Sequence, residues 1–288
     1  MIYLIISIFC SVTVAVLLKL AKRYKISIPQ AVTWNYLFAI GLSLFFFKPD
    51  LSKIITASPD KIYLALGVLL PVVFWCLAAS VKNIGIVKTD IAQRLSLFIP
   101  ILAAYFLFND QFKTVKLIGL AVGFTAIFFT LYKKSGSKTK GSDWIYPVMV
   151  FIGFGVIDIL FKKVAQINSI PYTSSLTIIF TLAFIISIVT LLYLAFIKKQ
   201  KLQLINFICG CILGFFNFFN ILFYLKAHQA MSNDPSTVFA GMNMGVIIVG
   251  SLVGILIFKE KLNKLNYLGL ALALAAIILI TISQIYAV

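Results

Sequence analysis

Long apolar runs separated by short polar segments dominate the pattern along this chain. The runs fall at residues 2–21, 30–47, 61–81, 89–108, 114–132, 144–165, 171–197, 203–225, 235–258 and 265–286. Each run is close to the roughly 20 apolar residues that an α-helix needs to cross the hydrocarbon core of a bilayer. The pattern therefore predicts an all-α membrane protein with ten transmembrane helices.

The polar hinges of the first half return in the second half. Phe108–Gly119 (FNDQFKTVKLIG) matches Phe258–Gly269 (FKEKLNKLNYLG): in both, a Phe precedes an acid, and a later Gly opens the next apolar run. Leu18–Pro29 likewise matches Phe161–Pro171, since both contain a Lys and end in Ser-Ile-Pro. Ordered matches separated by about half of the chain indicate a duplication.

The duplication predicts two repeats, at residues 1–132 and 144–288, joined by a polar linker at 133–143 (KKSGSKTKGSD). Five helices per repeat is an odd number, so the second repeat enters the membrane from the opposite side to the first. We therefore expect two inverted five-helix repeats. Proteins built in this way commonly place a substrate site between the repeats, near the bilayer midplane.

Composition and charge narrow the class of protein further. Apolar residues make up 62% of the chain and charged residues 11%, with a mean hydropathy of +1.07, whereas soluble domains are about half apolar and a quarter charged. Most of the basic residues behind the net charge of +17 lie in short loops between the apolar runs. Such loops fit anionic lipid headgroups better than nucleic acid, so we expect membrane lipids as partners and no nucleic acid.

The distribution of basic residues gives a first indication of orientation. The loops after the odd-numbered predicted helices hold 16 Lys and Arg residues, and those after the even-numbered ones hold 8. The positive-inside rule places the richer loops in the cytoplasm. This rule favours termini outside the cytoplasm.

The duplicated motifs resemble those of the EamA-like family of the drug/metabolite transporter superfamily. The resemblance rests on the acidic hinges, on Lys19 and Lys162 near the ends of corresponding helices, and on the segments ASVKNIG (79–85) and YLKAHQA (224–230). It implies export or exchange of small polar metabolites by alternating access. It also implies cytoplasmic termini, in conflict with the charge count. Asn109 and Asp110 stand where the family commonly has Gly-Glu, so the substrate branch stays open.

Polar residues inside the predicted helices are the candidate site residues. Asn217, Asn220 and Tyr224 share one face of the eighth predicted helix, and a polar stripe within a membrane helix points inward because hydrocarbon offers no hydrogen-bond partners. The stripe could contact substrate or could form interhelical hydrogen bonds. We favour substrate binding.

Charged residues at membrane depth form a second group of candidates. Asp158 lies deep in the sixth predicted helix, with Lys162 four residues later. An ionisable residue at that depth is a functional hypothesis by default: Asp158 could transfer a coupling proton, or could form an ion pair with Lys162. Arg94 lies four residues after Asp90 and could pair with it, or could meet an anionic substrate group.

Single positions complete the set of candidates. Trp75, Asn35 and Asn243 are assigned to substrate binding, and Pro71 and Pro100 to hinges, because a proline inside a membrane helix frees a carbonyl and permits a bend. His228 is expected at the interface, just beyond its helix. A single His and four cysteines without metal-ligand spacing predict no metal site, and no cofactor is expected.

These features favour a secondary transporter of the bacterial inner membrane. The predicted substrate is a small polar metabolite, an amino acid or a related zwitterion or anion, with proton coupling possible. The chain has no Walker A motif for ATP hydrolysis and none of the HExxH or GxSxG motifs of hydrolases, so an enzyme is not expected. Two alternatives stay open: a non-transporting membrane scaffold or lipid-binding helper, and an exchanger of phosphorylated sugars or nucleotide sugars.

Overall fold

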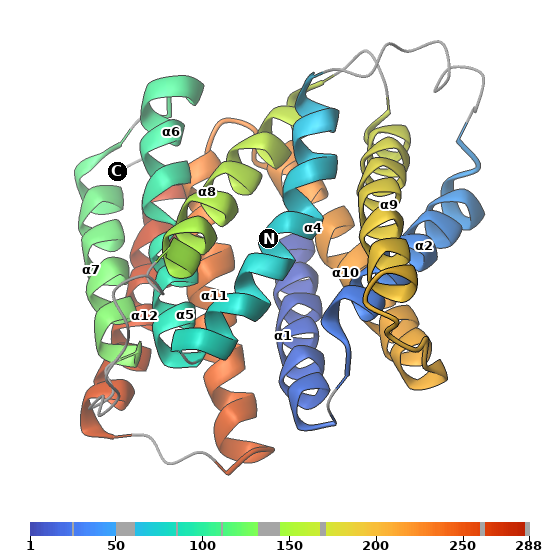
Figure 1. Ribbon diagram of the computed structural model, residues 1–288. Helices are drawn as coiled ribbons and strands as arrows, with labels where there is room; N and C mark the ends of the chain where they lie inside the picture. Colours follow the sequence, from blue (N-terminus) through green and yellow to red (C-terminus); the bar gives the residue numbers. More distant parts are fainter. Residues whose placement is uncertain are drawn as a thin grey trace.

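The computed structural model describes residues 1–24, 26–49, 61–84, 86–110, 112–131, 145–167, 171–259 and 263–285, so the predicted linker at 133–143 lies outside the described residues. Within these ranges the chain is helical and contains no strand (Figure 1). The helices are α1 (Ile2–Arg23), α2 (Ile28–Phe47), α4 (Lys61–Ile84), α5 (Ile86–Leu95), α6 (Phe98–Phe108), α7 (Thr114–Leu131), α8 (Ile145–Gln166), α9 (Tyr172–Phe196), α10 (Leu204–Ala230), α11 (Pro235–Leu256) and α12 (Lys264–Ile285).

Every predicted span overlaps a described helix, and one span is interrupted. The predicted helix at 89–108 is divided into α5 and α6 at Ser96 and Leu97. Pro100 lies in the first turn of α6 and has no backbone N–H to donate to the Ser96 carbonyl. That carbonyl accepts from the amide of Ile99 instead, at 3.0 Å. The interruption therefore follows from the proline.

Length and hydropathy support membrane insertion of this bundle. Within the described ranges, six helices are long and apolar enough to cross a bilayer: Ile28–Phe47, Lys61–Ser80, Tyr172–Phe196, Leu204–Ala230, Pro235–Leu256 and Lys264–Ser283. Three shorter apolar helices are found at Ile2–Leu18, Ala92–Phe108 and Thr114–Phe129. Large apolar side chains such as Phe45, Phe196 and Leu256 are 75–78% exposed on the outside of the bundle. Such a surface suits hydrocarbon as its solvent, and the protein is an integral, multi-pass membrane protein.

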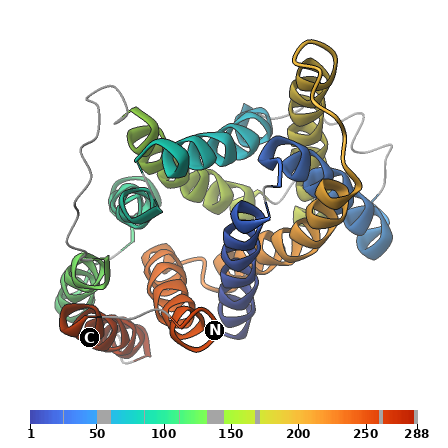
Figure 2. The ribbon, with the colours of Figure 1, turned by 60° about the horizontal axis from the view of Figure 1, so that its bottom comes forward.

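Helices from the two halves of the chain pack against one another. α7 and α12 lie side by side at one edge of the bundle, and α2 and α9 lie at the opposite edge (Figures 1 and 2). α2 is antiparallel to α9, because Thr33 bonds the carbonyl of Ser187 whereas Ser43 meets Thr177. α7 is antiparallel to α12, with Gly119 beside Ile280. α1, α8, α10 and α11 lie between these two edges.

Small residues bring α2 and α10 close together. A Cβ atom placed on Gly214 would lie 2.6 Å from the backbone oxygen of Asn35, and one on Gly210 would lie 2.8 Å from that of Ala31. Glycine at helix contacts lets backbones approach closely, which is the usual basis of helix association in membranes. These two glycines therefore fix the position of α10 against α2.

Candidate functional site

Four polar side chains form a column along the contact between α8 and α10, which we call the polar column. Its members are Asp158, Lys162, Tyr224 and His228. The Tyr224 hydroxyl on α10 donates to Asp158 Oδ1 on α8 at 2.9 Å. Tyr224 is buried, and its ring also meets Phe161 edge-on. Two residues that the sequence assigned to different roles thus lie together.

The predicted ion pair between Asp158 and Lys162 is wrong. Among the described residues, Lys162 makes no contact of salt-bridge length with a carboxylate; its Nζ donates to the backbone oxygen of Ser232 at 2.8 Å. Asp158 is bonded to Tyr224 instead. The four-residue spacing puts both side chains on one face of α8, but α10 and its following turn supply a nearer partner to each.

His228 lies inside this column, and its predicted interfacial position is wrong. The side chain is 0% exposed, and neither Nδ1 nor Nε2 has a hydrogen-bond partner among the described residues. Its ring lies between Tyr224 and Phe239, with centroid separations of 4.7 and 4.8 Å. The predicted helix ended at residue 225, whereas α10 continues to Ala230. One further turn of helix places His228 on the same face as Tyr224. The four-residue spacing between Tyr224 and His228 would have predicted this, had the helix been extended.

The polar stripe of α10 is divided between two neighbours. Asn220 accepts a hydrogen bond from Ser7 of α1 at 2.8 Å, so it bonds across the helix interface. Asn217 is buried, and no described residue accepts a hydrogen bond from its Nδ2. Tyr224 turns towards α8. Ser7 was not expected from the sequence, because a lone serine in an apolar run gives no indication of its partner.

The remaining predicted substrate residues have different surroundings. Asn35 on α2 is fully buried, and neither polar atom of its side chain bonds any residue that the structure describes. Trp75 on α4 is half-buried, and its indole N–H also lacks a partner. Asn243 donates to the carbonyl of Phe239 on its own helix, at 3.1 Å. Arg94 is half-buried in the last turn of α5; the side chain of Asp90, its predicted partner, lies outside the described residues.

The two predicted hinge prolines also differ. Pro71 lies inside the continuous helix α4, whereas Pro100 follows the interruption between α5 and α6. A proline early in a helix is tolerated because the first amides have no helical acceptor.

A charged cluster joins the two halves at one end of the bundle; Lys116 and Asp110 are buried in it, and Asp234 is half-exposed. Lys116 of α7 donates to Asp110 Oδ1 at 2.6 Å and lies 3.3 Å from Asp234 Oδ1. Asp110 Oδ2 accepts from the backbone N–H of Ser236, at 3.0 Å, in the first turn of α11. The sequence placed Asp110 in a polar hinge between two apolar runs. Its contact with the second half of the chain was not predicted. A contact between two helix ends that are distant in sequence produces no recognisable pattern in the residues around either one.

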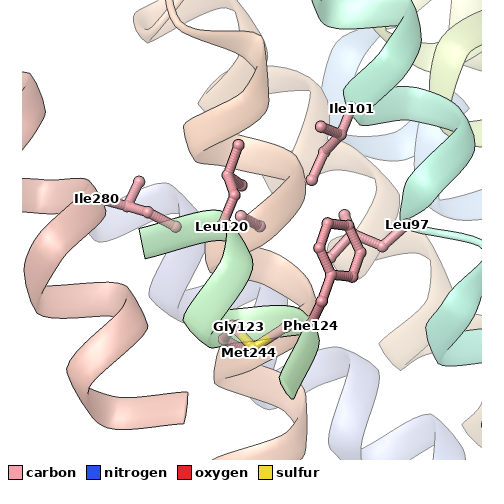
Figure 3. A pocket seen from close by; sticks show the side chains of 8 residues that line it. Leu97, Ile101, Leu120, Gly123, Phe124, Met244 and Ile280 are labelled. Carbon is pink, nitrogen blue, oxygen red and sulfur yellow. The ribbon is translucent and has the colours of Figure 1, made fainter. Parts of the chain in front are cut away.

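A small apolar hollow lies beside this region, between α6, α7, α11 and α12 (Figure 3). Its side chains fill it too closely to admit a water molecule. The lining residues are Leu97, Ile101, Leu120, Gly123, Phe124, Ala240, Met244 and Ile280. A polar metabolite would find no hydrogen-bonding side chain there, so the polar column is the better candidate site.

Comparison with known proteins identifies the family. A protein of Haemophilus influenzae without a described function is 44% identical over 282 residues, which cover 95% of each chain. A crystal structure with 10% sequence identity shares the fold, with a TM-score of 0.72 over 97% of this chain and 98% of the other. The sequence model of the EamA-like transporter family matches residues 1–132 and 143–282. Since these matches span both halves, the chain belongs to the EamA-like transporter family.

Proposed function

We propose that this protein is a secondary transporter that moves a small polar metabolite across the bacterial inner membrane by alternating access. The proposed substrate is an amino acid or a related zwitterion or anion, and the proposed direction is export or exchange. Membership of a transporter family supports the general class. The substrate class is supported by the chemistry of the bundle interior.

The observation on which the proposal rests is a set of buried polar atoms that no described residue bonds. Asn35, Trp75, Asn217 and His228 come from α2, α4 and α10, so both halves of the chain contribute. An unsatisfied buried polar group costs about 1–3 kcal/mol, and hydrocarbon offers no compensation. A substrate with several hydrogen-bonding groups is one ligand that could satisfy them during transport.

The proposed roles follow from where the side chains lie. Asn217, Trp75 and Asn35 are proposed to contact substrate, because each has an unpartnered donor. Tyr224 would orient Asp158 through its hydroxyl. Asn220, Asn243 and Arg94 stay candidates for substrate contact, although each of them already interacts with protein groups.

The arrangement of the helices supports an inverted repeat. α2 and α9 occupy corresponding places in the two predicted repeats, as do α7 and α12, and each pair is antiparallel. Alternating access in such folds is largely a movement of one repeat against the other around a fixed site. The interruption before Pro100 and the proline at position 71 are the proposed places where helices bend.

The experiment that tests this proposal is solute flux through the purified protein in liposomes. Labelled amino acids and phosphorylated sugars would be offered separately, with and without a pH gradient. Saturable uptake of an amino acid, absent from protein-free liposomes, is the expected result. Uptake of phosphorylated sugars alone would favour a sugar-phosphate exchanger. If folded protein takes up none of these compounds, the result would contradict their transport and favour a membrane scaffold.

A further inference from the structure

Two buried polar groups of the column have unusual surroundings. They are the ammonium of Lys162 and the imidazole of His228. Tyr224 of α10 bonds Asp158 of α8, and Lys162, one turn after Asp158, bonds Ser232, so His228 lies between these two contacts along α10. Both side chains are 0% exposed. Neither had been assigned to substrate contact from the sequence.

Lys162 has spare hydrogen-bonding capacity. An ammonium has three donors, and one of them bonds the Ser232 carbonyl. Its charge is also 5.9 Å from the centre of the Phe108 ring. The carboxylates of Asp110 and Asp234 also attract the Lys162 ammonium, but over a longer distance. Both carboxylates form ion pairs with Lys116 at closer range. Buried cations usually have a paired anion, so Lys162 is positioned to accept a further one.

His228 offers complementary chemistry beside it. A neutral imidazole has one N–H donor and one acceptor nitrogen, and in His228 both are buried without a partner in the part of the chain that the structure describes. The rings of Tyr224 and Phe239 confine its plane from two sides. A confined donor of this kind can select the geometry of the group that it binds.

We propose that Lys162 and His228 together bind the carboxylate of the transported amino acid. One carboxylate oxygen would accept from the ammonium and the other from the imidazole N–H, as charge-assisted hydrogen bonds. Asp158 lies one turn earlier on the same face of α8, held by Tyr224, and its carboxyl oxygens can accept a hydrogen bond from the ammonium group of the same substrate. The site therefore suits a zwitterion. This inference rests on the proposed function, and it adds His228 as a residue that determines specificity.

The test compares an amino acid with the same molecule whose carboxylate has been replaced by an uncharged amide. The best amino-acid substrate of the wild-type protein would be labelled in the liposome assay. Unlabelled amino acid and unlabelled amide would then compete for its uptake. Wild-type protein should prefer the amino acid strongly, and His228→Phe and Lys162→Met should each reduce that preference about 10- to 100-fold, the range expected for one hydrogen bond to a charged group.

Two matched variants separate recognition from general damage. His228→Gln retains a donor and an acceptor at similar reach, so it should keep most of the preference. Lys163→Met removes the adjacent, exposed lysine and should leave the preference unchanged. Size-exclusion chromatography would show that each variant is folded. If His228→Phe is not folded, His228→Leu replaces it. The comparison of Lys162→Met with Lys163→Met tests the carboxylate site independently of His228.

The possible failures are distinguishable. If wild-type protein takes up no amino acid, the proposed function falls, and this inference falls with it. If wild-type protein transports an amino acid but His228→Phe and Lys162→Met keep its full preference over the amide, the function stands and the carboxylate site is wrong. Equal competition by amide and amino acid in the wild type would also overturn the carboxylate site alone.

Discussion

At the scale of single residues, two asparagines three positions apart on α10 have different surroundings. Asn220 bonds Ser7 of α1, whereas Asn217 has a buried donor without a partner. Interhelical hydrogen bonds of the first kind average about 0.6 kcal/mol in membrane proteins. A donor of the second kind costs stability unless a ligand uses it. The two asparagines should therefore respond differently to the same substitution.

Asn220→Leu should lower the thermal stability of the detergent-solubilised protein, because it removes the bond to Ser7. Asn217→Leu should leave the stability near that of the wild type and abolish most of the flux. Both quantities can be measured on one preparation, with Asn83→Leu, at an exposed position of α4, as the control. Full flux in folded Asn217→Leu protein would remove Asn217 from the substrate site.

At the scale of elements, close contacts between helices hold the site residues in place. α10 supplies Asn217, Tyr224 and His228, and its own position depends on Gly210 and Gly214 against α2. Backbone atoms border the space beside Gly214, and backbone cannot move aside as a flexible side chain can.

Gly214→Ala should therefore destabilise the protein by about 1–3 kcal/mol, the usual cost of overpacking, and should reduce flux by shifting α10. Gly41→Ala is the matched control, since no atom lies within 4 Å of the Cβ that it adds. Thermal unfolding followed by intrinsic fluorescence compares the two. Equal melting temperatures for both variants would show that the α2–α10 contact tolerates a methyl group.

The charged cluster joins elements from the two halves of the chain. Lys116 holds Asp110 and Asp234, and removing it would leave the Asp110 carboxylate buried with only the Ser236 amide. Breaking one side of a buried ion pair typically costs about 3–5 kcal/mol.

Lys116→Met should accordingly lower the melting temperature markedly, and adding Asp110→Asn should recover part of the loss. Lys264→Met, at an exposed position in the first turn of α12, should have little effect. A double-mutant cycle on these variants measures the coupling between Lys116 and Asp110. Additive effects would mean that the pair contributes no coupling.

At the scale of the whole molecule, the proposed transport needs a source of energy. Asp158 is the acidic residue that the column places between α8 and α10, and a carboxyl inside a membrane bundle is a common element of proton relays. We propose it as the coupling group.

Asp158→Asn keeps the shape of the side chain but cannot release a proton. It should abolish any stimulation of uptake by a pH gradient, while exchange of labelled for unlabelled substrate at equal pH should persist in part. Uptake by wild-type and variant protein would be compared with and without the gradient. A gradient effect that survives in Asp158→Asn would assign the proton to another group.

The sequence by itself determined the class of protein and most of its helices. Runs of about 20 apolar residues can be buried stably only as helices in a bilayer, so the spans required no knowledge of their neighbours. The duplication and the family resemblance were equally visible in sequence, and the family match confirms the latter. The interruption at Ser96 and Leu97 could have been predicted, because Pro100 has no backbone N–H to donate. Its position depended on which other amide donates to the Ser96 carbonyl.

Only the tertiary structure decided which polar residues meet. Periodicity places a residue on a helix face, but the partner on that face comes from another helix, distant in sequence. Asp158 and Lys162 were correctly placed on one face, yet Tyr224 and Ser232 are their partners. His228 became a site residue because α10 extends one turn further than its apolar run. Chain pattern sets the elements, whereas contacts between them set the site.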